Sequence, residues 1–324
     1  GEVPREGDET ALHKVGETAR GIVVRGARTL ATLAPFADEL AVYPSMALPP
    51  QADAFALAFC IPMATPGLKF MCRDSCAVPT NLFDHPLSSR FDEQDAFVIF
   101  DNVEVPWDRV FINANLAVHN TVMTTSWYPN IMQQTMIRAQ TKLEFAWGLA
   151  TRMTEAINLS HPAALQMLGE IWAYAEFARA SIHSAEEESH PAGRDLWVPK
   201  GGPLTALRAM LPTWFPRVNE IIRLLGSHNL LTAPTRAQLN DPGLRPHLDR
   251  YLRGARNVGT EARARLFRLA WDFAGSSLAG RNELYERFYL GSGARNQQQA
   301  HVTALYSRAR ADRLVDRFLQ EVVP

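Results

Sequence analysis

The sequence has few cysteines, no long apolar run and no excess of charge of either sign. Three cysteines in 324 residues are too few, and odd in number, for a disulfide framework, so we expect a cytoplasmic protein. No stretch of 18 consecutive apolar residues occurs, and we expect no membrane span. With 33 Lys and Arg against 34 Asp and Glu, the charge indicates neither a nucleic-acid partner nor an anionic membrane surface.

The short motifs of common nucleotide and metal enzymes are also missing. The sequence contains no GxGxxG after a strand, no GxxxxGK[ST], no HExxH and no GxSxG. The nine histidines are scattered, and none is three or four residues from another. Cys72 and Cys76 have no further Cys or His pair nearby. We therefore expect no metal site.

What is present is a globular composition, with 47% hydrophobic and 21% charged residues, and a length that suits about two domains. The first third contains short apolar runs separated by Gly and Pro. These runs predict strands at 22–24, 41–43, 54–63, 69–73, 95–106 and 109–112. Short strands at such intervals indicate a small antiparallel barrel or sandwich.

The last two thirds have apolar residues at helical spacing. The pattern predicts long helices over 130–157, 161–188, 205–231, 246–280 and 297–323. Pro212 and Pro216 should bend or break the third of these helices. The fold class is therefore α+β, with an antiparallel β domain over residues 1–115 and an antiparallel helical bundle over 116–324.

Three stretches, residues 19–40, 84–111 and 273–296, are more specific. They resemble the large-component family of 4-hydroxyphenylacetate 3-monooxygenases, whose fold is similar to that of acyl-CoA dehydrogenases. That fold has an N-terminal helical domain, a middle β domain and a C-terminal helical bundle. The chain resembles the last two, so we expect the first domain, with the family's phenol-binding residues, to be absent from it. No catalytic residue is therefore assigned.

The resemblance implies a two-component flavin-dependent aromatic monooxygenase. A separate flavin reductase would supply reduced FAD, and molecular oxygen would be the co-substrate. The implied chemistry is hydroxylation of a phenol ortho to its OH group through a flavin C4a-hydroperoxide. The protein must then hold the ring close to the flavin and exclude water. The resemblance also implies a homotetramer or homodimer.

Residues near the start of the β domain match the family's flavin and substrate positions. Thr32, in TLAT, resembles a threonine whose hydroxyl contacts the flavin, although a strand threonine packed against its neighbours is the alternative. Pro44 and Ser45 resemble the start of the family's substrate loop, and an ordinary turn is the alternative there. This loop, over residues 43–54, contains no Lys or Arg. A free substrate carboxylate would need its cation from elsewhere, which favours a larger or carrier-tethered tyrosine derivative over a free phenylacetate.

Two further features of the helical part match the family's FAD site. The turn that resembles its FAD-contacting turn consists of Gly291, Ser292, Gly293 and Ala294. Glycines permit close backbone approach there, but a simple helix cap is the alternative. Arg138 resembles an arginine that helps to bind the FAD diphosphate, and a salt bridge is an equal alternative.

Other readings remain open. A CoA-thioester dehydratase or isomerase of the same superfamily would use an iron–sulfur cluster, but Gln133 stands where that branch commonly has a ligand His, and no Cys is near. A non-catalytic oligomerisation fragment is the other alternative. The polar stretch over 84–92 is interpreted as a structural network rather than as a catalytic one.

Overall fold

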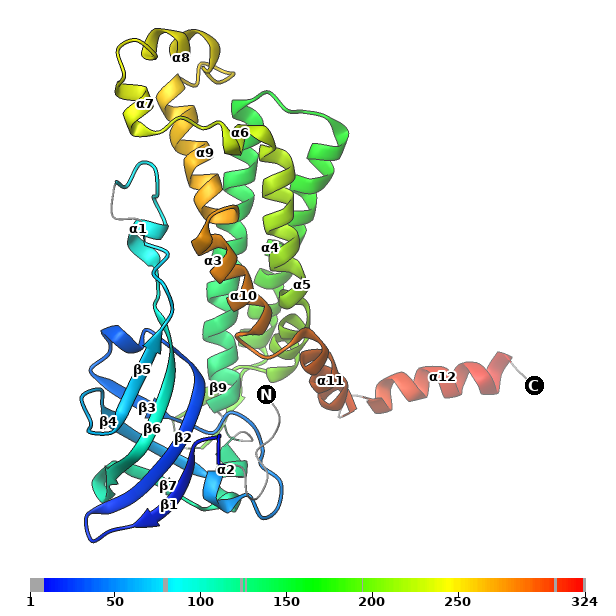
Figure 1. The fold of residues 1–324 in the computed structure, drawn as a ribbon. Coiled ribbons are helices and arrows are strands. Elements are labelled where there is room, and N and C mark those ends of the chain that lie inside the picture. The colour runs from blue at the N-terminus through cyan, green and yellow to red at the C-terminus, as the bar shows by residue number, and fades with distance from the viewer. Residues whose placement is uncertain are drawn as a thin grey trace. The chain divides into compact units, whose positions relative to one another are not determined.

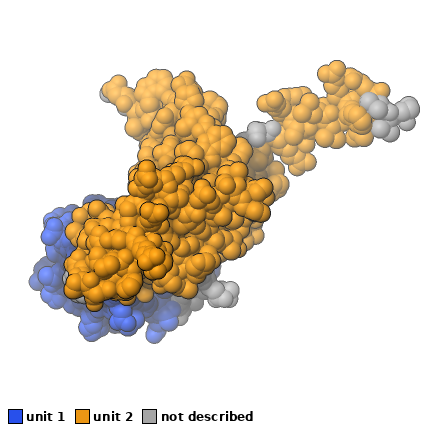
Figure 2. Space-filling model, turned by 90° about the horizontal axis from the view of Figure 1, so that it is seen from above, with its two compact units in different colours: residues 1–75, 92–128 blue, residues 76–91, 129–324 orange. Residues whose placement is uncertain are grey.

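The computed structural model describes residues 9–77, 81–122, 125, 127–193, 195–305 and 308–322. The chain divides into two compact units, coloured separately in Figure 2. The β unit contains residues 1–75 and 92–128, and the helical unit contains residues 76–91 and 129–324. Antiparallel sheets followed by a helical region confirm the predicted fold class. The division predicted from the sequence at residue 115 stays a prediction.

The β unit consists of two antiparallel sheets, shown in Figure 1. The four-stranded sheet has the order β1-β2-β6-β5, with β1 at His13–Glu17, β2 at Gly21–Thr32, β5 at Leu68–Cys72 and β6 at Asp95–Pro106. The three-stranded sheet has the order β3-β4-β7, with β3 at Glu39–Val42, β4 at Leu57–Pro62 and β7 at Val110–Asn113. Short 3-10 helices lie at Ala34–Phe36, Asp53–Phe55 and Trp107–Arg109, and helix α2 is Leu116–Val122.

Side chains from both sheets form the core of the β unit. Ile22 and Val105 on one sheet and Phe59 on the other are completely buried in one apolar cluster. The register of the long strand β2 with β6 shifts between Val24 and Gly26. Gly26 has φ +115°, and a Cβ there would lie 2.3 Å from the carbonyl oxygen of Ala11. Only glycine permits this bulge.

Residues 76–91 leave the β unit between β5 and β6 and join the helical unit. Helix α1, Ser88–Phe91, lies in this segment. The backbone N–H groups of Leu87 and Ser88 donate to the carboxylate of Asp272 at 2.7 and 2.8 Å, and the Ser88 hydroxyl donates to it at 2.6 Å. Asp84 accepts a hydrogen bond from the N–H of Arg236 at 2.8 Å. The polar stretch thus attaches this segment to the helices, as its structural interpretation expects.

The long helices of the helical unit are α3 at Trp127–Ala156, α4 at Pro162–Glu187 and α5 at Gly201–Gly226. Helix α5 packs against α4, α9, α10 and α11, and its side chains Leu204 and Ile221 are fully buried. It continues through Pro212 and Pro216, so these prolines do not break it. A two-stranded ribbon, β8 at His190–Pro191 with β9 at Trp197–Val198, lies between α4 and α5.

The predicted single helix over 246–280 is wrong. The chain instead forms α8, Arg245–Tyr251, then α9, Thr260–Ala274, and α10, Ser277–Phe288. Arg256 and Asn257 have positive φ, which ends helical geometry between α8 and α9. Ser276 accepts from the N–H of Ala279 and so begins a new helix at α10. Shorter helices complete the unit: α6 at His228–Leu231, α7 at Arg236–Asn240, α11 at Gly293–Ala304 and α12 at Arg308–Val322.

Helices α11 and α12 occupy the range predicted as one helix over 297–323, with residues 306 and 307 between them outside the described residues. Within the described part of the chain, no helix combines the length and the apolar character needed to cross a bilayer.

Candidate flavin and substrate site

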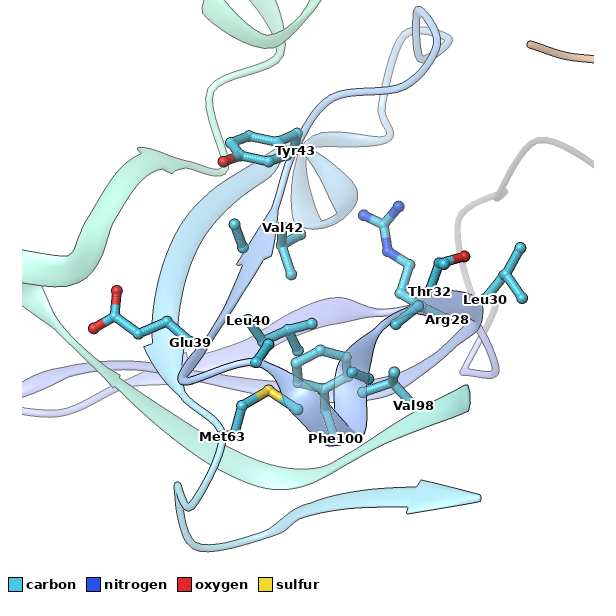
Figure 3. A pocket seen from close by; sticks show the side chains of 14 residues that line it. Arg28, Leu30, Thr32, Glu39, Leu40, Val42, Tyr43, Met63, Val98 and Phe100 are labelled. Atoms are coloured by element: carbon cyan, nitrogen blue, oxygen red, sulfur yellow. The ribbon is translucent and has the colours of Figure 1, made fainter. Parts of the chain in front are cut away.

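A cavity of about 300 Å³ lies in the β unit beside the end of β2. Figure 3 shows Arg28, Leu30 and Thr32 coming from this strand, while Glu39 and Leu40 come from β3. Its floor is apolar, with Val98 and Phe100 of β6. An apolar cavity with a few polar groups is typical of a small-molecule site.

The Thr32 hydroxyl has a fixed orientation at this cavity. Its Oγ1 donates to Oδ1 of Asp95 at 2.9 Å, across the β2–β6 pairing. Asp95 in turn accepts from Nε of Arg73 at 2.9 Å, and Arg73 also pairs with Asp92 at 2.5 Å. Because the hydroxyl proton is directed to Asp95, the oxygen keeps lone pairs that can accept a hydrogen bond from a ligand N–H. This suits the predicted flavin contact, which stays a prediction.

A second cavity, of about 260 Å³, also lies in the β unit and includes the predicted substrate loop. Ser45 is exposed and lines it, whereas Pro44 is buried and is not part of its lining. Arg28 and Tyr43 line both cavities. The two cavities are therefore neighbours that share a cation and an aromatic ring.

Arg28 and His119 give the second cavity its electrostatic character. Within the described part of the chain, no hydrogen bond or ion pair involves the Arg28 side chain, and burial lowers the pKa of its guanidinium. His119, on α2, is only 4% exposed, and its Nδ1 has no hydrogen-bond partner. Burial, and then the charge of Arg28, lower the pKa of His119. The imidazole is therefore held in its neutral form beside a permanent cation.

The turn predicted to contact FAD lies in the helical unit, between α10 and α11. Gly291 has φ +99°, and Ser292 is the N-cap of α11, accepting from the N–H of Arg295 at 3.4 Å. Arg208 donates Nε to the carbonyl of Leu290 at 2.9 Å and so fixes the chain before the turn. The first N–H groups of a helix have no intrahelical acceptor, so those of Gly293 and Ala294 can meet an anionic ligand.

Arg138, on α3, lies in the same unit but is engaged in an ion pair with a buried carboxylate. Its terminal nitrogens donate to the two carboxylate oxygens of Glu286 at 2.7 and 2.9 Å. The guanidinium also lies over the rings of Tyr285 and Tyr289. Burial opposes its charge, but the hydrogen bonds and charge of Glu286 outweigh burial and raise the pKa of Arg138. The salt-bridge alternative thus describes the contacts of Arg138, and its role toward FAD stays a prediction.

The predicted residues therefore fall into two groups. Thr32, Pro44 and Ser45 lie in the β unit, and Arg138 lies with the turn over 291–294 in the helical unit. Sequence reasoning missed Arg28 and His119. The usable signal for Arg28 was a cation in an otherwise apolar strand pattern, four residues before Thr32. No local sequence pattern indicates the burial of His119, because this burial depends on tertiary packing.

The residues described here contain no group of three or more His, Cys, Asp and Glu side chains that could hold a metal ion. Gln133 donates to Glu186 at 2.6 Å, which connects α3 to the end of α4.

Two family models match the chain in succession. The model described as 4-hydroxyphenylacetate 3-hydroxylase N terminal matches residues 2–112, and that described as 4-hydroxyphenylacetate 3-hydroxylase C terminal matches residues 118–320. Together these matches cover nearly the whole chain, with residues 113–117 between them.

Individual proteins show the same likeness. The oxygenase component of 4-hydroxyphenylacetate 3-monooxygenase from Thermus thermophilus is 40% identical over 309 residues, 95% of this chain and 63% of the relative. A Streptomyces globisporus monooxygenase of (3S)-3-amino-3-(3-chloro-4-hydroxyphenyl)propanoyl-[peptidyl-carrier protein SgcC2] is 31% identical, over 94% of this chain and 58% of that protein. The chain thus spans about three fifths of the length of these curated relatives.

Among solved structures, the oxygenase component of 4-hydroxyphenylacetate 3-monooxygenase complexed with FAD and 4-hydroxyphenylacetate matches with a TM-score of 0.90 and 37% identity. The match covers 97% of this chain and 66% of that one.

Proposed function

Because the chain belongs to the 4-hydroxyphenylacetate 3-hydroxylase family, we propose that it acts in the oxygenase component of a two-component monooxygenase that hydroxylates a phenol ortho to its OH group. The observation that supports this most strongly is the succession of both family matches, over residues 2–112 and 118–320. Reduced FAD would supply the activation of molecular oxygen, and a separate flavin reductase would deliver it.

The residues of this chain would bind FAD and orient its flavin ring. In the β unit, the oxygen of Thr32, held by Asp95, would accept a hydrogen bond from the flavin ring. The apolar floor made by Val98 and Phe100 would exclude water from one side of that ring. In the helical unit, the N–H groups of Gly293 and Ala294 would meet anionic oxygens of FAD, with Ser292 and Gly291 shaping the turn. The charge of Arg138 would act on FAD only in part, because the carboxylate of Glu286 already balances it.

The phenol would bind beside Ser45, in the cavity next to the flavin position. A free phenol and a carrier-tethered tyrosine derivative both remain candidates, since relatives named for each class match the chain. We also propose assembly into a homodimer or homotetramer, which sedimentation equilibrium would measure.

The activity is tested by mixing the protein anaerobically with chemically reduced FAD and a phenol, then adding oxygen. We expect a catechol in proportion to the flavin oxidised, and isotopic oxygen from dioxygen in the new hydroxyl group. Hydrogen peroxide alone, with every phenol of the panel, would reject the proposed function.

The role of Thr32 has its own test in FAD binding. Thr32→Val removes the hydroxyl at nearly constant volume, and we expect FAD affinity to fall about five- to tenfold, the value of one hydrogen bond. Thr32→Ser keeps the hydroxyl and should bind FAD nearly as well. Equal FAD affinity of the valine and serine variants, measured by equilibrium dialysis, would contradict the contact.

A further inference from the structure

A carboxylate outside the first cavity controls how the Thr32 hydroxyl can bind a ligand inside it. Asp95 faces Thr32 across the β2–β6 pairing, and its Oδ1 accepts the Thr32 hydroxyl at 2.9 Å. Thr32 lines the cavity of about 300 Å³, whereas Asp95 is not one of its lining residues. The side chain of Asp95 is 12% exposed. Any effect of Asp95 on a ligand in this cavity must therefore act through the threonine.

An arginine fixes the orientation of Asp95. Nε of Arg73 donates to Oδ2 of Asp95 at 2.9 Å, so the two oxygens of this carboxylate have different donors. The guanidinium is itself fixed by Oδ1 of Asp92 at 2.5 Å and by the carbonyl oxygen of Glu93 at 2.6 Å. Beside this permanent cation, Asp95 is a carboxylate at neutral pH and has no proton to donate. The hydroxyl of Thr32 must therefore donate to Asp95, and toward a ligand its oxygen can only accept.

A hydroxyl that is restricted to accepting can distinguish the two oxidation states of a flavin. In the oxidised ring N5 is a hydrogen-bond acceptor, and two-electron reduction places a hydrogen on N5 and makes it a donor. N3–H, by contrast, is a donor in both states. An acceptor facing N5 would leave this contact unmade with the oxidised ring and would form a hydrogen bond with the reduced ring. A freely rotating hydroxyl would serve both states equally, because it can donate or accept.

We propose that Asp95 is a positioning residue, which makes the contact of Thr32 with the flavin N5 selective for reduced FAD. Arg73 supports this role by holding the Asp95 carboxylate against the hydroxyl. The contact would be lost when the ring is oxidised, so spent cofactor would be bound less tightly than its reduced replacement. This inference rests on the proposed function, because it concerns the flavin site of that activity.

Arg28 is a second group of the same cavity that responds to the oxidation state. It lines the cavity beside Thr32, and a cation there favours a reduced ring that carries a negative charge. A preference of the unchanged protein for reduced FAD would therefore not by itself identify Asp95. The informative quantity is the change in this preference when Asp95 is altered and Arg28 is kept.

The test measures the dissociation constants of oxidised FAD and of chemically reduced FAD under anaerobic conditions, by ultrafiltration. In Asp95→Asn, Arg73 would keep the amide oxygen on its own side, so the NH₂ group would face Thr32 and free the hydroxyl proton for the ligand. We expect the ratio of the oxidised to the reduced dissociation constant to fall about tenfold. Such a fall lowers the midpoint potential of the bound flavin by about 30 mV, since two electrons are transferred. Thr32→Val should lower the ratio as well, and Thr32→Ser should keep it.

Glu104→Gln is the matched control. Glu104 lies on the same strand, β6, accepts from the Thr18 hydroxyl at 2.7 Å and pairs with Arg20 at 2.6 Å, but it lines neither cavity. This variant should leave the ratio unchanged. The contacted atom is identified with 5-deaza-FAD, in which a carbon replaces N5. Because neither oxidation state of this analogue has a polar atom at that position, Asp95→Asn should not change its ratio.

Four results would overturn the inference. One is equal weakening of oxidised and reduced FAD by Asp95→Asn, as expected if Thr32 contacts N3–H. Another is a ratio that Glu104→Gln lowers as much as Asp95→Asn does. The third is an equal effect of Asp95→Asn on the ratios of FAD and 5-deaza-FAD. The fourth is a ratio that survives Thr32→Val, which decides the matter even where Asp95→Asn does not fold. If the unchanged protein bound FAD in neither state, the proposed function would fail as well, whereas FAD binding with unaltered ratios rejects this inference alone.

Discussion

Glu286 accepts hydrogen bonds from both terminal nitrogens of Arg138, and its buried carboxylate joins α10 to α3, where Arg138 is half-buried. Lys142 donates to the same carboxylate at 2.9 Å. Burial disfavours the charged carboxylate, but the hydrogen bonds and charges of Arg138 and Lys142 outweigh it and lower the pKa of Glu286. The buried carboxylate therefore pairs with two half-buried cations of α3.

Glu286→Gln should destabilise the protein by about 3 kcal/mol, because two half-buried cations lose the buried carboxylate that they share. Urea unfolding followed by circular dichroism measures the change. Glu176→Gln is the matched control, since Glu176 pairs with Arg179 on the exposed surface of α4. It should change the free energy of unfolding by less than about 1 kcal/mol. A Glu286 variant as stable as the Glu176 variant would show that the buried network is not stabilising.

Gly291→Ala should destabilise the turn before α11 by about 1–3 kcal/mol, because alanine is strained at positive φ. Its Cβ would also lie 3.0 Å from Oδ1 of Asn296. Gly293→Ala, two residues later, is the control. A Cβ at Gly293 has Pro212 as its nearest neighbour, at 3.7 Å, and the residue starts a helix. In thermal unfolding, we expect the Gly293→Ala variant to have the highest Tm and the Gly291→Ala variant the lowest, with the unchanged protein between them. The reverse order would reject the strain argument.

Asp272→Ala should release the segment that contains Leu87 and Ser88 from the helical unit. Three hydrogen bonds to this carboxylate are lost, each worth about 1.5–3 kcal/mol for a charged acceptor if taken alone. Hydrogen–deuterium exchange measured on peptides over 81–91 should become faster by at least tenfold. Ser89→Ala is the control, because the Ser89 hydroxyl donates to the carbonyl of His85, one turn earlier in the same segment. Unchanged exchange in the Asp272 variant would contradict this attachment.

The pKa of His119 is lowered in the folded protein, mainly by burial and then by Arg28. The unfolded chain binds a proton below about pH 6.5, while the native imidazole resists it, so the free energy of unfolding falls as the pH decreases through this range. His119→Gln should reduce the drop in Tm between about pH 7.5 and about pH 5.5. His301→Gln, at an exposed position on α11, serves as the comparison. The same drop in both variants would exclude His119 as a contributor.

Local sequence patterns predicted the elements that depend on local chemistry. The alternation over 95–106 predicts β6, Asp95–Pro106, residue for residue, because its buried and exposed side chains alternate along most of the strand. Strand β1, His13–Glu17, was missed because its five residues include two charged side chains and a glycine. The helix over 246–280 was drawn too long, because a helical apolar pattern continues on both sides of Arg256 and Asn257 although the backbone turns there.

Only those residues of the candidate site that lie in a recognisable motif could be predicted from the sequence. Thr32 and the turn after α10 lie in long matching stretches, so their positions could be named from the sequence. Arg28 and His119 are 91 residues apart and share one cavity only because β2 and α2 pack within the same unit. Nor does any local pattern indicate that Glu286 neutralises Arg138, 148 residues earlier. Such pairings depend on tertiary packing, which the hydrophobic periodicity of the sequence does not indicate.

The attachment of Ser88 to Asp272 also bears on how the protein is made. The two residues are 184 positions apart, so Asp272 is synthesised roughly 10–40 s after Ser88 at ordinary translation rates. During that interval the groups of Leu87 and Ser88 that bond to Asp272 have only water, or a chaperone, in place of that carboxylate. The strands of the β unit can pair while the chain is still on the ribosome. The segment between β5 and β6, however, can bond to Asp272 only after α9 has emerged. A ribosome stalled between these two points should therefore present a nascent chain that proteases cut within residues 81–91.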